Sequence, residues 1–257
     1  MNLLAFDTST DLLSAAVQRA GVPEPGLFSG PGGAQASASL IPAVLRLLEQ
    51  AGLSLPQLDA IAFGAGPGSF TGLRSACAVA QGLGYGAGVP LLPVDTLLAV
   101  AEEARLCVAE SEPTLAAARA LADGQPCGVL VAMDARMDEV YSARYLRQHG
   151  VWQPLGDWQV AKPEQLAAPP AGLPDDLPWL LVGNAAAVYG ARLPDLPRLS
   201  AWPSARALLQ LAPALLAAGQ AVPAAQALPR YVRDKVAQTT AEREAAKQAA
   251  ALPQVSA

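Results

Sequence analysis

The chain contains 257 residues, of which 52% are hydrophobic and 15% are charged, and its formal net charge is −5. Such an acidic chain is poorly suited to neutralising many phosphates of a nucleic acid, so any action on RNA would need a basic partner. The low charge content also indicates that some apolar surface is covered by a partner. The three cysteines are odd in number and widely spaced, which argues against a disulfide framework or a zinc site and favours a reducing, cytoplasmic location.

The sequence predicts neither secretion nor a membrane span. Met1 leads directly into a strand pattern without a basic region. The longest apolar stretch, Ala76–Ala101, is interrupted by two prolines and by Asp95. These interruptions argue against a transmembrane helix.

Two segments with the same pattern indicate an internal repeat. "LLAFDTSTDLLSAAV" (Leu3–Val17) reads as a strand, a polar turn and a second strand, with Asp7 at the end of the first strand. "LVAMDARMDEVYSAR" (Leu130–Arg144) reads in the same way around Asp134. The two segments therefore predict two similar hairpins.

A second pair of segments follows the hairpins in the same order. "AIAFGAGPGS" (Ala60–Ser69) and "WLLVGNAAAV" (Trp179–Val188) each read as an apolar strand that ends in glycine before a helix. Two such copies predict an α/β protein with two layered subdomains, each a sheet with helices on its faces. We place the first subdomain at residues 1–105, the second at 106–237, and a disordered or frayed tail at 238–257.

A helix is predicted over Ser39–Gly52, with Gly52 as its end. Its apolar residues recur at helical spacing and form a stripe. This stripe either packs on the helix's own sheet or meets a partner, and the pattern favours neither. The residues of the stripe are Leu40, Ile41, Val44, Leu47 and Leu48.

The helix predicted over Thr71–Gly86 carries little charge. It is rich in alanine and glycine, and glycine inside a helix costs up to about 1 kcal/mol relative to alanine, so close packing must outweigh propensity. The helix is either buried in its own domain or covered by another chain. We favour the second alternative, because a small subdomain rarely covers a helix on all sides.

The glycine loop before this helix, "GAGPGS" (Gly64–Ser69), does not fit a Walker A motif, because no Gly-Lys-Ser/Thr follows. Glycine backbone and a helix N-terminus could still hold an anion, although a tight turn capped by Ser69 or Thr71 is the stronger interpretation. "DTST" (Asp7–Thr10) could bind Mg-phosphate or form an ordinary Asx-turn. The candidate nucleotide- or anion-binding residues are Asp7, Thr8, Ser9, Gly66, Gly68, Ser69 and Thr71.

The sequence offers no catalytic constellation. His149 is the only histidine, which argues against a paired-histidine metal site and against a Ser-His-Asp relay. "DARMDEVY" (Asp134–Tyr141) gathers three acids and an arginine, but a charged hairpin turn explains it equally well. We therefore expect neither a metal site nor catalytic residues.

Four motifs together resemble the bacterial TsaB (YeaZ) family. They are "LLAFDTST", "GAGPGSFTGLRSACAVAQGL", "DARMDEVY" and "YVRDKVA", and the match runs in order over most of Met1–Ala237. Proteins of this family are paralogues of TsaD. The resemblance implies an actin-like (ASKHA) fold of two RNase H-like subdomains, in agreement with the repeat.

The resemblance implies a non-catalytic partner subunit that binds and activates TsaD. TsaD transfers the threonylcarbamoyl group to the adenosine beside the anticodon of tRNAs that read codons beginning with A. It also implies TsaE as a further partner, a homodimer when the chain is alone, tRNA contact only through the complex, and no cofactor of its own apart from ATP or ADP at the TsaD interface. The implied partner-binding helix faces contain Leu40, Val44, Leu47, Leu48, Phe70, Arg74, Ala76, Val79 and Leu83.

Two other functions are alternatives. An ATP-dependent phosphotransferase of the actin-like superfamily would use Asp7 and the glycine loop. A peptidase, which older names of the family suggest, is disfavoured by the lone His149.

Overall fold

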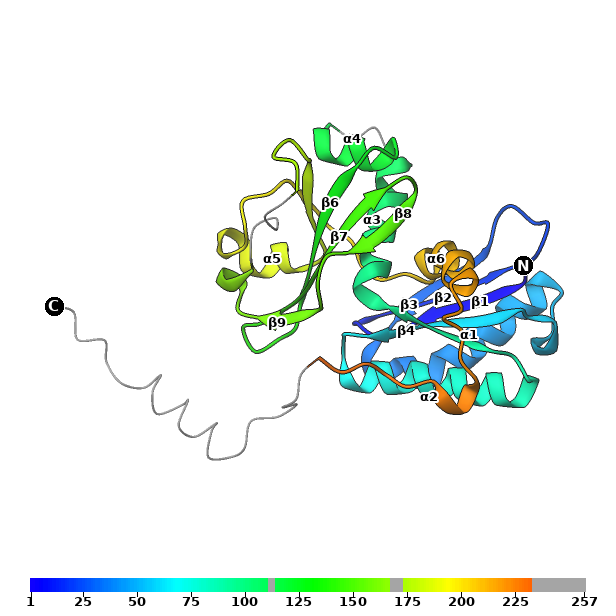
Figure 1. Cartoon of the computed structure of the whole chain (residues 1–257). Helices are drawn as coiled ribbons and strands as arrows, with labels where there is room; N and C mark the ends of the chain where they lie inside the picture. Colours follow the sequence, from blue (N-terminus) through cyan, green and yellow to red (C-terminus); the bar gives the residue numbers. More distant parts are fainter. Residues whose placement is uncertain (111–113, 167–172, 233–257) are drawn as a thin grey trace, which may run out of the picture.

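The computed structural model describes residues 1–110, 114–166 and 173–232 (Figure 1). The expected tail at 238–257 lies outside these residues. Within the described residues, no helix is both long enough and apolar enough to cross a membrane.

The first sheet has five strands in the order β3-β2-β1-β4-β5. β1 pairs antiparallel with β2 and parallel with β4, and β3 and β5 form the two edges. β1 and β4 are buried along their whole length, as expected for central strands that are covered on both faces. The strands are β1 (Leu3–Asp7), β2 (Leu12–Gln18), β3 (Gly26–Pro31), β4 (Ala60–Gly66) and β5 (Leu91–Asp95).

The second sheet repeats this arrangement. Its strand order is β11-β10-β6-β7-β8, and the short β9 also pairs with β7. β6 pairs antiparallel with β7 and parallel with β10, as β1 does with β2 and β4. The strands are β6 (Cys127–Asp134), β7 (Val140–Gln148), β8 (Val151–Pro154), β9 (Gln159–Ala161), β10 (Trp179–Val182) and β11 (Arg198–Leu199).

The shared topology confirms the predicted duplication and the α/β fold class. Asp7 ends β1 and Asp134 ends β6, while Gly64 lies near the end of β4 and Gly183 directly follows β10. The chain thus has the expected actin-like fold of two RNase H-like subdomains, each with a mixed sheet and flanking helices.

Helices cover both faces of the first sheet. α1 and α2 pack on one face, and α6 packs on the other together with part of α3 (Figure 1). The longer helices are α1 (Ala36–Ala51), α2 (Phe70–Ala87), α3 (Thr96–Ala109), α4 (Ala116–Ala122), α5 (Ala185–Tyr189) and α6 (Ala205–Ala217). Short 3-10 helices are η1 (Gly33–Gln35), η2 (Leu55–Gln57), η3 (Pro163–Gln165), η4 (Gly190–Arg192) and η5 (Ala224–Gln226).

The ends of α1 and α2 follow from local chemistry. α1 ends at Gly52, which adopts the expected left-handed conformation. The Oγ of Ser69 caps α2 by accepting a hydrogen bond from the backbone N of Gly72 at 3.5 Å. Ser69 is therefore the N-cap that the sequence suggested.

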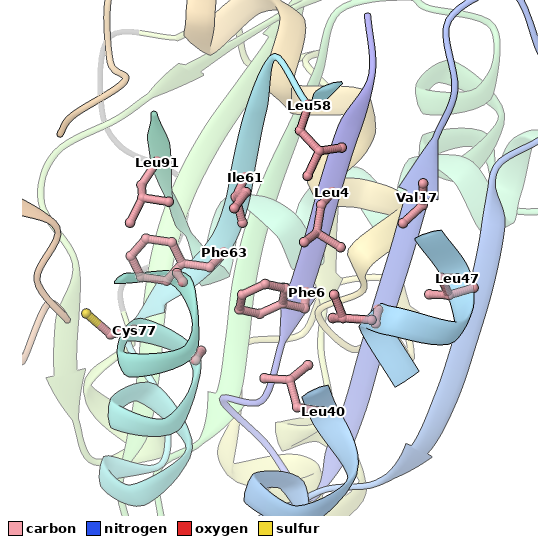
Figure 2. Close-up of a cluster of buried hydrophobic side chains, with 14 of the residues drawn as sticks. Leu4, Phe6, Val17, Leu40, Leu47, Leu58, Ile61, Phe63, Cys77 and Leu91 are labelled. Carbon is pink, nitrogen blue, oxygen red and sulfur yellow. The ribbon is translucent and has the colours of Figure 1, made fainter. Parts of the chain in front are cut away.

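Figure 2 shows the core between the first sheet and helices α1 and α2. Leu4, Phe6, Ile61 and Phe63 of the sheet meet the inward stripe of α1, including Leu40. Burying each large side chain contributes about 1.5–3 kcal/mol, so this layer holds α1 and α2 firmly on the sheet.

The chain passes between the subdomains more than once. The boundary placed at Arg105 falls inside α3, which contacts strands of both sheets. α6 then returns to the first sheet, and the segment after it pairs at Val222 with Leu91 before running beside α2. Gln81 Nε2 holds this segment by donating to the carbonyl O of Ala227 at 2.8 Å.

Candidate functional site

The glycine loop packs directly against the β1–β2 turn. The backbone N of Ser69 donates to the carbonyl O of Ser9 at 2.7 Å. The Oγ1 of Thr8 donates to the carbonyl O of Gly72 at 2.7 Å. The loop and the turn therefore satisfy each other's polar groups.

Glycine is required in the loop and in the first turn of α2 because their backbone approaches the β1–β2 turn so closely. A Cβ at Gly72 would overlap with the carbonyl O of Thr8, and one at Gly68 would lie 2.7 Å from both Cβ and O of Ser9. Real Cβ atoms essentially never come this near. The glycines thus serve the packing of the loop and of the start of α2 on the β1–β2 turn.

Asp7 is buried below this contact. Its Oδ1 accepts hydrogen bonds from the backbone N of Ser9 at 2.8 Å and from the Oγ of Ser9 at 2.7 Å. Its Oδ2 has no hydrogen-bond partner within the described parts of the chain. Burial raises the pKa of Asp7, and the hydrogen bonds from Ser9 offset part of this rise.

A cleft of about 570 Å³ lies between the two subdomains. Ser9, Gly68 and Ser69 line it, whereas Asp7, Thr8, Gly66 and Thr71 are not in its wall. The structure therefore brings only part of the predicted nucleotide- or anion-binding set to the cleft. Its opposite wall comes from the second subdomain and includes Asn184.

An ion pair joins the two subdomains across the cleft. Arg136, in the β6–β7 turn, lies with its Nη2 2.8 Å from Asp11 Oδ2 and its Nη1 3.2 Å from Asp134 Oδ2. Arg136 and the next two residues all have positive φ angles. Non-glycine residues with positive φ are often found at functional sites. The charged "DARMDEVY" segment was the only sequence signal for this turn.

Aromatic and cationic side chains gather where α2 begins. The rings of Phe70 and Tyr231 lie 5.4 Å apart, and the Cζ of Arg74 lies 3.8 Å from the centre of the Phe70 ring. The Nε of Arg74 donates to the Tyr231 hydroxyl at 3.1 Å. Tyr231 was part of a family motif, but nothing local in the sequence predicted that it would reach α2.

Five of the predicted partner-binding residues are buried in the first subdomain. The inward face of α1 and one residue of α2 pack on the sheet, so these side chains do not form an outer face. The expectation was wrong for them because the sheet itself covers the stripe. They are Leu40, Val44, Leu47, Leu48 and Ala76. Val79 and Leu83 are partly buried against the same core, and Phe70 and Arg74 are exposed.

The exposed surface of these helices contains apolar and small residues beside charged ones such as Arg46 and Glu49. Ile41 and Leu45 lie one turn apart on α1, and Leu45 is 52% exposed. Ala78, Gly82 and Tyr85 follow helical spacing on α2, and Tyr85 is 83% exposed. We call these five residues the outer face. They are apolar, small or aromatic, and they point away from the sheet.

Comparisons with known proteins support one family. The sequence model of a family described as "TsaD: tRNA N6-adenosine threonylcarbamoyltransferase" matches residues 33–251. The tRNA threonylcarbamoyladenosine biosynthesis protein TsaB of Escherichia coli K12 is 32% identical over 92% of this chain and 96% of its own length. The TsaB protein of Haemophilus influenzae is 35% identical over 64% of this chain and 66% of its own length.

A solved structure agrees with the sequence relatives. YeaZ from Pseudomonas aeruginosa has a TM-score of 0.75 and 37% sequence identity, covering 90% of this chain and 99% of that chain. A related structure, described as similar to peptidase YEAZ, matches equally well with a TM-score of 0.75. The sequence match over 92% of this chain, the shared structure and the duplicated fold show that this chain belongs to the TsaB (YeaZ) family.

Proposed function

We propose that this chain is a non-catalytic subunit of the tRNA threonylcarbamoyladenosine pathway that binds TsaD and activates it. The relatives from Escherichia coli and Haemophilus influenzae are named as proteins of tRNA threonylcarbamoyladenosine biosynthesis, which supports this pathway. The outer face supplies the surface for a partner. TsaD would transfer the threonylcarbamoyl group to the adenosine beside the anticodon of tRNAs that read codons beginning with A.

The observation that carries the proposal is the exposed apolar surface of α1 and α2. Ile41 and Leu45 of α1 and Tyr85 of α2 expose large apolar areas beside small residues that let another helix approach closely. α1 and α2 are in contact with each other, and large exposed apolar patches commonly mark a protein interface. The buried faces of α1 and α2 already fix both helices on the sheet, so a partner can bind to the outer face without disturbing the core.

The packing of the β1–β2 turn supports a non-catalytic role. A phosphotransferase of the actin-like superfamily would need Asp7 at the nucleotide, but Asp7 and Thr8 are buried and their polar groups face the protein interior. The backbone N of Ser69, in the glycine loop, also donates a hydrogen bond to the carbonyl O of Ser9 in the turn. These contacts make the phosphotransferase alternative the weaker one. Absence of ATP turnover by the pure chain would eliminate it, whereas turnover lost in Asp7→Ala would revive it.

A peptidase is also weakly supported by the geometry. His149 lies in the turn between β7 and β8 and does not belong to the wall of the cleft. It is therefore not placed to act as a base on a substrate held there.

The proposal includes several further parts. The outer face would form a homodimer when the chain is alone and would exchange that contact for TsaD. TsaE would join the complex, tRNA would be reached only through it, and ATP or ADP would bind at the TsaD junction. The chain would act in the cytoplasm.

Binding to TsaD tests the proposal. The full chain is mixed with purified TsaD, and complex mass is measured by light scattering with and without ATP. Leu45→Glu and Tyr85→Glu should each abolish the complex, because a charge would be desolvated without a partner. Addition of the wild-type chain to TsaD should raise the yield of modified nucleoside in tRNA.

A matched control separates the outer face from exposed apolar residues in general. Val151, on β8 of the second subdomain, is as exposed as Leu45, so Val151→Glu should leave the complex intact. Circular dichroism of every variant shows whether the fold is kept. Normal complex formation by both folded outer-face variants would contradict the choice of surface, and failure of the wild-type chain to bind TsaD would contradict the function.

A further inference from the structure

Helix α3 connects the hydrophobic cores of both subdomains. Ala99 packs in the core between the first sheet and α6, whereas Leu97, Val100 and Ala104 pack in the core of the second sheet. Figure 1 shows α3 between the two halves of the molecule. A helix in this position sets how one half is oriented relative to the other.

Asp95 joins the start of α3 to the second subdomain. Its Oδ1 caps the helix by accepting from the backbone N of Leu97 at 2.8 Å. Its Oδ2 accepts from the Trp158 indole N at 2.8 Å and from the Tyr145 hydroxyl. One carboxylate therefore fixes the helix end and holds two aromatic side chains of the other half.

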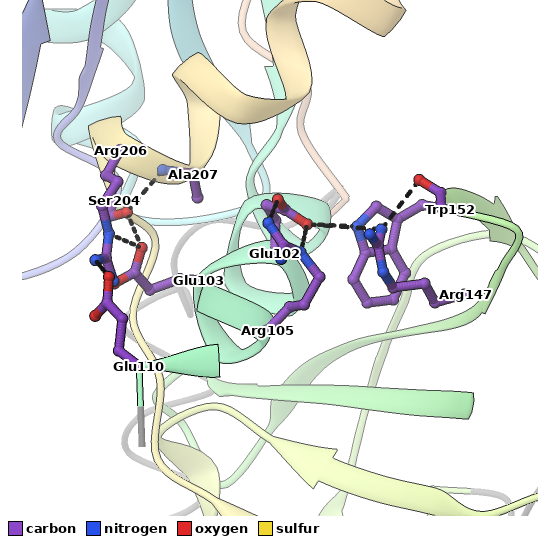
Figure 3. Close-up of polar contacts among 10 residues, drawn as sticks. Glu102, Glu103, Arg105, Glu110, Arg147, Trp152, Ser204, Arg206 and Ala207 are labelled. Atoms are coloured by element: carbon purple, nitrogen blue, oxygen red, sulfur yellow. Dashed lines mark hydrogen bonds and ion pairs between the residues drawn. The ribbon is translucent and has the colours of Figure 1, made fainter. Parts of the chain in front are cut away.

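Glu102 repeats this contact two turns later on α3. Its Oε2 accepts from the Trp152 indole N at 2.8 Å, and Arg105 donates to both of its oxygens at 2.6 and 3.0 Å (Figure 3). Arg147 lies over the Trp152 ring at 5.2 Å and has its Nη1 4.0 Å from Glu102 Oε2. Glu102 is only 4% exposed, and its charge is met by donors from both α3 and the β7–β8 hairpin.

The spacing of these residues makes the two contacts one unit. Asp95, the N-cap of α3, and Glu102 are seven residues apart, while Tyr145 and Arg147 are two apart and lie on one face of β7. The first half of α3 thus runs along β7 and accepts an indole N–H at its N-cap and another at Glu102. We call these two carboxylates, with Trp152 and Trp158, the α3 clamp.

The neighbouring side of α3 is fixed to the first subdomain. Glu103 accepts from Arg206 Nη2 at 2.7 Å and from the Ser204 hydroxyl, which itself caps α6 (Figure 3). α6 packs on the first sheet. Consecutive glutamates therefore attach α3 to opposite halves of the molecule.

We infer that the α3 clamp holds the two subdomains in one fixed orientation, so that the cleft between them keeps its width and the chain moves as a single body. The device is independent of the proposed function. Removing one donor leaves a buried carboxylate short of a hydrogen bond. This destabilises the arrangement seen here relative to one in which the subdomains separate and water reaches α3. The cross-cleft pair of Arg136 and Asp11 is solvent-exposed and contributes little by comparison.

Spin labels across the cleft measure the orientation directly. Labels are placed at Leu12→Cys and Val188→Cys, both exposed, in a Cys107→Ala background of the full chain. The intact clamp should give one narrow distance distribution. Replacing both indole donors, with Trp152→Phe and Trp158→Phe, should broaden and shift it, because phenylalanine keeps an aromatic ring but has no N–H to donate.

Hydrogen exchange provides a second measurement. The double variant should show about tenfold faster amide exchange in α3 and β7, since each lost hydrogen bond lowers the free energy of local opening. Glu102→Gln, which keeps the shape but removes the charge, should give a similar change if the double variant does not fold. Glu110→Gln, which changes the exposed second partner of Arg206, is the control and should change neither measurement. An unchanged distance distribution together with unchanged exchange in the folded clamp variants would overturn the inference.

Discussion

The side chain of Asp7 lies directly against the backbone of Gly64, so that a Cβ atom at position 64 would overlap with Asp7 Oδ2. Asp7 is 1% exposed and is held by two hydrogen bonds from Ser9, so it has no space to move away. The backbone of Gly64 does not have a positive φ and would accept alanine. The glycine that ends the strand pattern is thus required by the buried carboxylate.

Gly64→Ala should therefore destabilise the protein, mainly through this overlap. We expect a loss of about 1–3 kcal/mol in the free energy of unfolding, measured by urea denaturation. Adding Asp7→Ala should recover part of that loss, because it removes the overlapping oxygen. Gly82→Ala is the control: a Cβ there meets no atom within 4 Å, and alanine should stabilise α2 by about 0.5–1 kcal/mol. Equal effects of the two substitutions would contradict the explanation.

Asp7 should also make stability depend on pH. Burial raises its pKa above the ordinary value of 3.8, so the folded state binds its proton more tightly than the unfolded state does. Stability should therefore fall as pH rises from 3.8 through the raised pKa, and stay level above it. Asp7→Asn removes this dependence. The variant should be more stable than wild type at pH 7, and the difference should disappear near pH 4.

Glu164→Gln is the control, because the pH dependence of stability that Glu164 causes has the opposite sign. The hydrogen bond from Arg192 lowers the pKa of Glu164, so its contribution is present at pH 7 and lost as pH falls. The variant should therefore be slightly less stable at pH 7 and equal to wild type in acid. If Asp7→Asn followed the same direction, the assignment of Asp7 as a desolvated acid would be wrong.

Local patterns were sufficient to predict the duplicated fold. The apolar runs that end in Asp7 and Asp134 are strands buried in their own sheets, and the turn after each is set by nearby residues. Such apolar runs and turns are short-range patterns, so they can be recognised directly in the sequence. They led to the correct hairpins and to the strands β4 and β10, which the structure pairs in parallel with β1 and β6.

The inward face of α1 could not be predicted in the same way. Leu40 and Leu47 face the sheet while Ile41 and Leu45 face outward, yet all four are large aliphatic residues. Helical periodicity defines the stripes, but only tertiary packing decides which one the sheet covers.

The residues around the cleft could not be predicted from the sequence for a related reason. Arg136 and Tyr231 reach it from positions that are far apart in the chain, so no local motif brings them together. Glu102 likewise resembles part of a charged helix surface, and only the fold shows that Trp152 covers it.

The three cysteines should differ in reactivity. Burial raises the pKa of Cys127 to about 12, and burial also raises the pKa of Cys77. Burial, together with Glu103, also raises the pKa of Cys107, so exposure decides the order. Because Cys107 is partly exposed and the other two thiols are buried, iodoacetamide at pH 8 should label Cys107 first and leave the other two largely unmodified. Mass spectrometry of the folded protein checks this order, and all three should react at similar rates in denaturant. Rapid labelling of Cys127 in the folded chain would mean that the start of β6 opens to solvent.

The two faces of α1 should respond differently to the same substitution. Leu47 is 4% exposed in the core, so Leu47→Glu would bury an unpaired charge and should cost on the order of 3 kcal/mol of stability. Leu45→Glu places the same charge in solvent and should change stability by less than about 0.5 kcal/mol. Urea denaturation measures both values, and binding to TsaD is then assayed only for variants that remain folded. Loss of binding by a stable Leu45→Glu protein would locate the contact on the outer face, whereas a stable Leu47→Glu protein would show that α1 is not seated on the sheet as described.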